Sequence, residues 1–221
     1  ETCSRQSCLM PEICKNLSTS HKELHHLLDS VQSENPKTVV ASGIRHDLAL
    51  KDREYIKIIA RYFTGGLLKL APEHCSATVL KSMNKPSISL FEKFSEIFKE
   101  ESKAAGKTQH IVPYIIVGHP GETLADTVEL ALWLKKNKMR VKQVQEFTPT
   151  PMSISTCMYF TEKDFNTGKP VYVAKGREKR LMKALVQWFM SENRKLVREA
   201  LEKADRRDLI QHFVRLAKNQ K

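Results

Sequence analysis

The sequence lacks the features that mark membrane, secreted and disulfide-stabilised proteins. Its 221 residues contain no uninterrupted apolar run near the roughly 18–20 residues that span a bilayer. The first residues do not form the basic and apolar pattern of a signal sequence. Cysteine is scarce and odd in number, with five residues, which argues against a disulfide framework in a chain without secretory features. We therefore expect a soluble, cytoplasmic protein.

What the sequence does contain is an ordinary core-forming composition with an excess of positive charge. Hydrophobic residues make up 41% and charged residues 28%, and the formal net charge is +12. These proportions allow one packed domain, with or without a helical extension. The charge is uneven, because residues 171–221 hold 14 Lys or Arg against 6 Asp or Glu. Such a segment can contact nucleic acid, but interleaved acidic residues are also typical of a solvated helical face.

Short apolar runs alternate with amphipathic runs over the first two thirds of the chain. The apolar runs favour strands covered on both faces, and the amphipathic runs favour helices. The strands recur about every 30–40 residues, which fits parallel strands joined by crossover helices. Four such units make half a barrel or an open sheet rather than a closed eight-stranded barrel. The expected strands are residues 37–41, 67–71, 110–117 and 141–147, and the expected helices are residues 53–63, 90–105 and 124–136.

The last part of the chain changes in character. Residues 153–176 are rich in turn-forming residues and are expected to form a loop. Three runs with helical spacing follow and predict a helical appendix. The expected helices of this appendix are residues 177–190, 194–204 and 207–218.

Polar and turn-forming residues follow the expected strands. In parallel α/β folds, ligands bind at the carboxyl ends of the strands, and glycine there lets backbone approach a ligand closely. Glycine and proline also follow ordinary strands, so a single turn carries little weight. Four such ends at one edge of a sheet favour a ligand site. The candidate residues are Ser42, Arg45, Glu73, His74, Gly118, His119 and Gly121.

Three cysteines crowd the start of the chain, at Cys3, Cys8 and Cys14. Clustered thiolates bind soft metals and iron–sulfur clusters. Their spacing, with four and five residues between them, differs from that of a standard zinc site. We keep two interpretations open: ligands of an auxiliary cluster, or three reduced thiols in a loop.

Several strings together resemble the later part of the YgiQ-type radical S-adenosylmethionine (SAM) proteins, from near residue 3 to at least residue 205. The resemblance implies a partial parallel (β/α)6 barrel that holds a [4Fe–4S] cluster and SAM, followed by a C-terminal helical region. In that class the reduced cluster cleaves SAM, and a 5′-deoxyadenosyl radical abstracts hydrogen from a substrate. The strings are ASGIRHD (41–47), LKLAPEH (68–74), LKSMNKP (80–86), GHPG (118–121), ALWLK (131–135) and VQEFTPTP (144–151).

The resemblance also implies roles for the candidate residues. Ser42 and Arg45 would bind the ribose or carboxylate of SAM, since Arg is the natural bidentate partner of a carboxylate, and Glu73 would accept from its ammonium group. The two histidines of the candidate site would be polar contacts or proton carriers. The glycine-containing turn would lie against the adenine. An interstrand salt bridge is the alternative for Arg45 and Glu73.

The chain departs from the family pattern at its main cluster. None of its five cysteines has the Cys-x3-Cys-x2-Cys spacing of the cluster loop, which we expect to lie upstream of Glu1. The fragment alone should therefore not assemble the catalytic cluster, and its catalytic residues and substrate are unknown. The alternative is a nucleic-acid-binding or metal-binding module without catalysis. The expected regions are a Cys-rich lead-in with a helix (1–36), the barrel portion (37–170) and the basic helical region (171–221).

Overall fold

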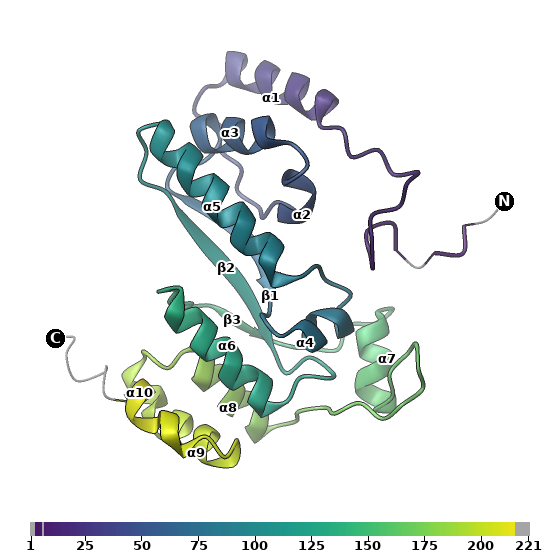
Figure 1. Cartoon of the computed structure of the whole chain (residues 1–221), viewed down its shortest axis with the longest axis vertical. Helices are drawn as coiled ribbons and strands as arrows, with labels where there is room; N and C mark the ends of the chain where they lie inside the picture. Colours follow the sequence, from purple (N-terminus) through teal and green to yellow (C-terminus); the bar gives the residue numbers. More distant parts are fainter. Residues whose placement is uncertain (1–2, 6, 215–221) are drawn as a thin grey trace. The chain divides into compact units, whose positions relative to one another are not determined.

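The computed structural model describes residues 3–5 and 7–214 and shows an α/β protein (Figure 1). Within this part of the chain, ten α-helices and two 3₁₀ helices accompany a three-stranded sheet. The expected α/β class is confirmed. The three described strands form an open sheet. No helix among the described residues combines the length and the apolar character needed to cross a bilayer.

The sheet has the strand order β1-β2-β3. Its strands are β1 (Leu67–Glu73), β2 (His110–Val117) and β3 (Val144–Glu146). β2 and β3 are parallel, with Val117 opposite Glu146. Ile44 adds a single parallel bridge to Leu70 of β1. The Phe147 N–H, just beyond β3, donates to the Val117 carbonyl at 2.8 Å, so the ends of β2 and β3 stay together.

The chain divides into two compact units that interleave along the sequence. Unit 1 consists of Glu1–Pro72 and Asn84–Pro113, and unit 2 consists of Glu73–Met83 and Tyr114–Lys221. The last residue of β1 and the second half of β2 thus belong to unit 2. The boundaries predicted near residues 36 and 170 describe a different division and stay predictions.

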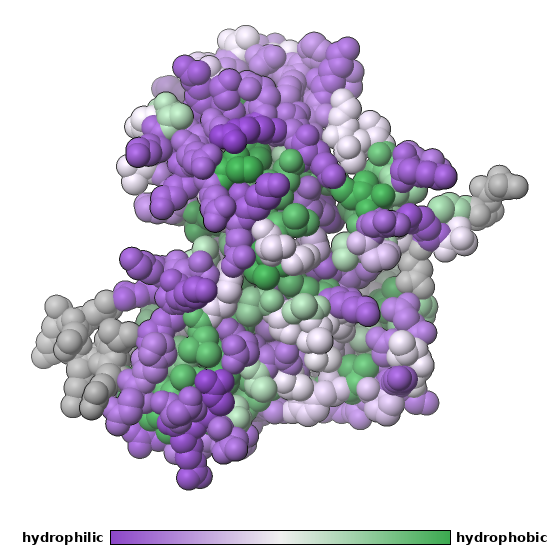
Figure 2. Space-filling view, in the orientation of Figure 1, coloured by the Kyte–Doolittle hydropathy of each residue, from purple (hydrophilic) through white to green (hydrophobic). Residues whose placement is uncertain are grey.

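Unit 1 is built around aromatic residues of one long helix. Its helices are α1 (Lys22–Glu34), α2 (His46–Ala49), α3 (Arg53–Tyr62) and α5 (Ile88–Ala104). Phe91, Phe94 and Phe98 form a stripe along α5 and are almost completely buried. The Asp52 carboxylate accepts from the Tyr55 N–H at 3.1 Å and so caps α3, which packs against α5. Figure 2 shows that hydrophilic residues cover most of the visible surface.

Unit 2 contains the remaining helices. They are α4 (Ala77–Ser82), α6 (Leu124–Lys136), α7 (Ile154–Thr161), α8 (Arg177–Val186), α9 (Arg194–Lys203) and α10 (Ile210–Val214), with 3₁₀ turns at Ser191–Asn193 and Arg207–Leu209. α8 packs against both α6 and α9. Leu130 and Leu134 of α6 and Leu181 and Leu185 of α8 are completely buried in one core.

Several elements lie where the sequence predicts them. β2 and α6 coincide with the expected 110–117 and 124–136. At the start of α6, the Thr123 hydroxyl and the Asp126 carboxylate each accept from the other's backbone N–H, which is a capping box. A continuous apolar run in β2 and a clear cap at the start of α6 made these elements predictable.

Other predictions are wrong. Residues 37–41 are not a strand. The chain after them pairs with the sheet at one residue, Ile44, which forms a bridge to Leu70. Residues 153–176 are not all loop, because the Ser153 hydroxyl accepts from the Thr156 N–H at 3.2 Å and starts α7. The helix expected at 177–190 ends at Val186. The one expected at 207–218 is a 3₁₀ turn followed by α10, and residues 215–218 lie outside the described residues.

Candidate functional site

The turn that follows β2 is organised by a buried carboxylate, that of Glu122. Its Oε2 accepts from the Gly118 N–H at 2.7 Å and from the His119 N–H at 3.3 Å. Its Oε1 accepts from the Thr127 hydroxyl at 2.7 Å. The side chain is completely inaccessible to solvent. A buried carboxylate needs such donors, so these bonds fix the path of the chain from β2 into α6.

His74, just after β1, faces the same carboxylate. Its Nδ1 accepts from the Ser76 N–H at 2.9 Å, so the neutral ring carries its proton on Nε2. This Nε2 lies 3.5 Å from Oε1 of Glu122 and makes no hydrogen bond within the described part of the chain. Both side chains are fully buried. The pair therefore links the end of β1 to the turn after β2.

His119 is held at both ring nitrogens. Its Nδ1 lies 2.8 Å from the Pro120 carbonyl, and its Nε2 lies 2.8 Å from Oγ of Ser155. A carbonyl only accepts, so Nδ1 carries the proton, and Nε2 accepts from the Ser155 hydroxyl. Burial lowers the pKa of His119, although the bond to Pro120 and the charge of Glu122 oppose the effect. The ring is therefore neutral in one tautomer.

The two glycines of the turn have positive φ angles and close neighbours. Gly118 has a φ of +75°, and a Cβ atom there would lie 3.0 Å from Cγ of Lys179. Gly121 has a φ of +94°, and its Cβ would lie 3.0 Å from Oγ of Ser82. The Gly121 N–H donates to the Tyr172 carbonyl at 2.8 Å. Packing within the protein therefore accounts for both glycines.

Glu73 ends β1 in an unusual conformation. It has a φ of +66° and is buried. A non-glycine residue in the left-handed region costs about 1–3 kcal/mol, and such residues cluster at functional sites. The structure thus places a strained acidic residue at a strand end, beside His74 in the sequence.

Lys179 of α8 lies against the same turn. Its Nζ donates to the Phe147 carbonyl at 2.8 Å. It also lies 5.6 Å and 4.8 Å from the ring centroids of Phe147 and Tyr159, within the range of cation–π attraction. Burial lowers the pKa of Lys179, and the charge of Glu146 partly opposes this.

Ser42 and Arg45 belong to unit 1, whereas the other five candidate residues belong to unit 2. Nε and Nη2 of Arg45 donate to the two oxygens of Asp47 at 3.0 and 2.5 Å. Burial raises the pKa of Asp47, but the hydrogen bond and charge of Arg45 outweigh this and leave that pKa lowered. The carboxylate partner of Arg45 is therefore local, two residues on. Ser42 is exposed. That all seven residues share one site stays a prediction.

The cysteines differ in exposure. Cys3 and Cys8 are exposed, and Cys14 is buried, with its N–H donating to the Cys8 carbonyl at 2.7 Å. Among the described residues, no group of three or more His, Cys, Asp or Glu side chains is arranged to hold a metal ion. The auxiliary-cluster hypothesis stays a prediction. Burial, with the charge of Glu129, raises the pKa of the Cys75 thiol to about 12, so Cys75 is a poor nucleophile.

The sequence analysis missed three residues of this assembly: Glu122, Ser155 and Lys179. Glu122 had a local signal, because it follows the glycines directly. A carboxylate at that position can reach back to the N–H groups of its own turn. Ser155 and Lys179 had no such signal, since they lie far along the chain and reach the turn only through tertiary packing.

Comparisons with known proteins find a family match and several similar proteins. Residues 142–216 match a family described as a domain of unknown function (DUF3362). The chain is 46% identical over 94% of its length to a UPF0313 protein of Methanosarcina acetivorans, of which the match covers 28%. It is 44% identical over 96% of its length to one of Geobacter sulfurreducens, with 36% covered. It is 41% identical over 95% of its length to the UPF0313 protein YgiQ of Escherichia coli K12, with 30% covered.

The chain thus spans about a third of the length of these relatives. The matches extend over both units, and the family of unknown function covers β3 and the helices after it. None of the relatives' names states a reaction.

Proposed function

Since the chain is a homologue of the UPF0313 proteins, YgiQ among them, we propose that it is the part of a radical SAM enzyme that faces SAM and the substrate. Relatives about three times longer supply the context for this proposal, and the strings shared with YgiQ-type radical SAM proteins supply the reaction class.

The observation that carries the proposal is the buried polar assembly at the strand ends of unit 2. His74 and Glu122 are fully buried, and His119 is nearly so. Protein interiors retain such groups where they are hydrogen-bonded or functional. Ligands of open parallel sheets bind at this end of the strands, and Glu73 adds backbone strain there.

The residues present fit parts of SAM. The Glu73 carboxylate, in unit 2, suits the ammonium group of the amino-acid moiety. Arg45 already holds Asp47 in both arms of its fork, so a carboxylate ligand would compete with Asp47. The N–H groups of Gly118 and Gly121 are engaged within the protein, so they are not free donors to the adenine.

The residues present do not fit the main [4Fe–4S] cluster. That cluster needs three cysteines in one loop with the Cys-x3-Cys-x2-Cys spacing, and no such loop occurs in this sequence. Residues outside the chain would hold the cluster. In this class, SAM and the cluster together supply hydrogen-abstracting radical chemistry, and the present residues would bind, orient and shield SAM and the substrate.

The positive charge of residues 171–221 favours nucleic acid as a second candidate ligand. Part of that charge is neutralised within the protein. Nη2 of Arg177 lies 2.5 Å from Oε2 of Glu199, and Nζ of Lys183 lies 3.3 Å from Oε1 of Glu146. We therefore rank nucleic-acid binding behind the enzyme, with salt-sensitive RNA binding as its test.

The test is anaerobic reconstitution of the full-length parent with iron and sulfide, followed by measurement of 5′-deoxyadenosine formed from SAM under reduction. We expect Glu73→Gln to lower this formation at least about tenfold, since it removes a charged contact to SAM. Glu100→Gln is the matched control, because it removes an exposed carboxylate that pairs with Arg53 in unit 1 and should leave 5′-deoxyadenosine formation unchanged. A reconstituted parent that carries the cluster and forms no 5′-deoxyadenosine would overturn the proposal.

A further inference from the structure

The turn after β2 is contacted by two side chains and one backbone carbonyl from the chain segment after β3. Ser155 reaches His119, the Tyr172 carbonyl accepts from Gly121, and Lys179 packs beside Gly118. All three lie within the 142–216 match to a domain of unknown function. The contacts connect that region to the candidate site residue by residue.

The two hydrogen bonds of the His119 ring favour one neutral tautomer. The Pro120 carbonyl requires the proton on Nδ1, and the Ser155 hydroxyl then donates to Nε2, both at 2.8 Å. Without Ser155, the buried Nε2 would lose its donor. Ser155 lies in the first turn of α7, a helix capped by Ser153, so its position is fixed by the helix.

Lys179 contacts the turn with its methylene stem and binds the Phe147 carbonyl with its ammonium group. Its methylene stem occupies the space that a Cβ of Gly118 would fill. Its Nζ holds the Phe147 carbonyl at 2.8 Å, and the Phe147 ring meets the His119 ring edge-on with 5.2 Å between centroids. One lysine therefore fixes the backbone beside β2 and the aromatic wall of His119.

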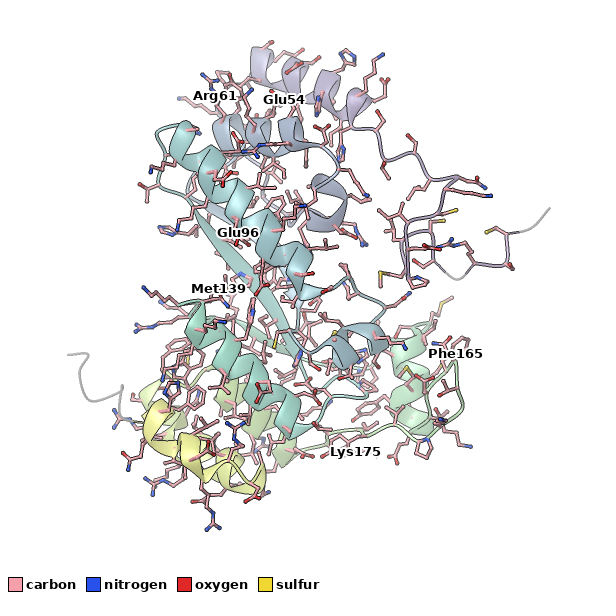
Figure 3. All side chains as sticks on the ribbon, viewed as in Figure 1. Glu54, Arg61, Glu96, Met139, Phe165 and Lys175 are labelled. Atoms are coloured by element: carbon pink, nitrogen blue, oxygen red, sulfur yellow. The ribbon has the colours of Figure 1, made fainter. Side chains whose placement is uncertain are left out.

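The third contact, from the Gly121 N–H to the Tyr172 carbonyl, depends on the loop between α7 and α8. The Val171 N–H donates to the Glu162 carbonyl at 2.8 Å, and Lys163 bridges Pro170. Lys175 pairs with the Glu162 carboxylate. Figure 3 labels Lys175 before α8 and Phe165 at the far side of this loop. The loop thereby presents the Tyr172 carbonyl to Gly121.

We propose that Ser155 and Lys179 are positioning residues, which hold the Gly118–Gly121 turn and the neutral His119 ring in the shape that binds SAM. The inference rests on the proposed function for the identity of the ligand. It gives the region of unknown function a specific role, which is to preorganise the strand-end turn. Preorganised contacts bind more tightly because less freedom is lost on binding.

The first experiment reads the ring of His119 directly in this chain by ¹⁵N NMR, with histidine labelled and His119→Gln used for assignment. We expect a protonated Nδ1 and an Nε2 that accepts a hydrogen bond. Ser155→Ala should shift the Nε2 signal, and Ser155→Thr should restore it. Thr161→Val is the matched control, because that hydroxyl of α7 donates to the Cys157 carbonyl of its own helix. An unchanged His119 spectrum in Ser155→Ala would overturn the proposal.

The second experiment measures the affinity of the full-length parent for SAM. We expect Ser155→Ala and Lys179→Met to weaken binding about tenfold or more, since small misplacements are costly. Lys183→Met on α8 is the control, because Lys183 holds Glu146 at the surface and not the turn. Equal affinities in wild type and both variants would overturn this inference alone. A wild-type parent with a loaded cluster that binds no SAM would overturn the proposed function instead, and with it the role toward SAM.

Discussion

A buried carboxylate needs several donors, and Glu122 has three. Two of them are N–H groups of its own turn, so the site begins with local bonding that the sequence GHPGE already suggests. Gly118, His119 and Gly121 could be singled out from sequence because they directly follow an expected strand. Lys179 and Ser155 could not, because nothing in their sequence neighbourhood records which distant backbone they meet. Local chemistry was predictable at the residue scale, and tertiary partners were not.

Gly118 and Gly168 separate the energetic cost of a left-handed backbone from the cost of overpacking. Gly118→Ala should destabilise the fold by about 1–2 kcal/mol for the left-handed backbone, with a further cost of about 1–3 kcal/mol for overpacking against the Lys179 stem. Gly168 also has a positive φ, of +66°, but nothing lies within 4 Å of its Cβ position. Gly168→Ala should therefore show only the backbone cost. Urea unfolding of both variants checks this, and equal losses would contradict the packing argument.

We expect His119 to make the stability of the fold depend on pH. Its pKa is lowered from 6.5 by burial, so the unfolded chain binds a proton more readily than the folded one. Its contribution is therefore complete above about pH 6.5 and is lost as the pH falls below that value. His119→Asn should reduce the loss of unfolding free energy between pH 7 and pH 5.5, whereas His110→Asn, at an exposed position, should not.

Two carboxylates do not interfere in that window. The pKa values of Asp47 and Asp126 are lowered from 3.8 by hydrogen bonds that outweigh burial. Their stabilising effect persists until the pH falls to about 3.8 and below. If His119→Asn shows the same loss as wild type between pH 7 and pH 5.5, the buried neutral ring is not its source.

At the scale of elements, the sequence predicts what strong periodicity and caps define. β2 and α6 were placed correctly, and α5 nearly so, because an apolar run and a phenylalanine stripe leave few alternatives. α4 and α7 were missed because they have six and eight residues, too few for a periodic pattern. Residues 37–41 read as a strand because their composition is apolar, but a strand also needs a neighbour along its length.

The start of α6 can be tested separately. Thr123→Ala removes the hydroxyl that accepts from the Asp126 N–H, and loss of an N-cap costs about 1 kcal/mol. Thr123→Ser keeps the hydroxyl and should be close to wild type. Denaturant midpoints compare the two. A full-stability Thr123→Ala variant would show that the Ser76 hydroxyl, which donates to Asp126 at 2.8 Å, suffices to hold the helix start.

At the scale of the whole molecule, the interleaved units decide which pieces can fold. The short segment Glu73–Met83 belongs to unit 2, although the chain returns to unit 1 before completing unit 2. This segment supplies His74 to Glu122 and the Ser82 hydroxyl to the Pro120 carbonyl. A boundary between these units cannot be found from sequence alone, because no single cut separates them.

A fragment of residues 114–221 should therefore be less stable than the same residues within the full chain. It leaves the buried Glu122 without His74 and the start of α6 without Ser76, and buried polar groups that lose a partner cost about 1–3 kcal/mol each. Hydrogen exchange of the β2–α6 turn measures the difference. Equal protection in fragment and full chain would show that unit 2 does not need residues 73–83.

The packing of Lys179 against Gly118 also has a consequence for folding during synthesis. A ribosome adds about 5–20 residues per second, so roughly 3–12 s separate the synthesis of the turn from the synthesis of its lysine. Throughout this interval the turn after β2 lacks its contacts with Lys179. The turn can therefore gain its contacts with Lys179 only after the start of α8 has been synthesised.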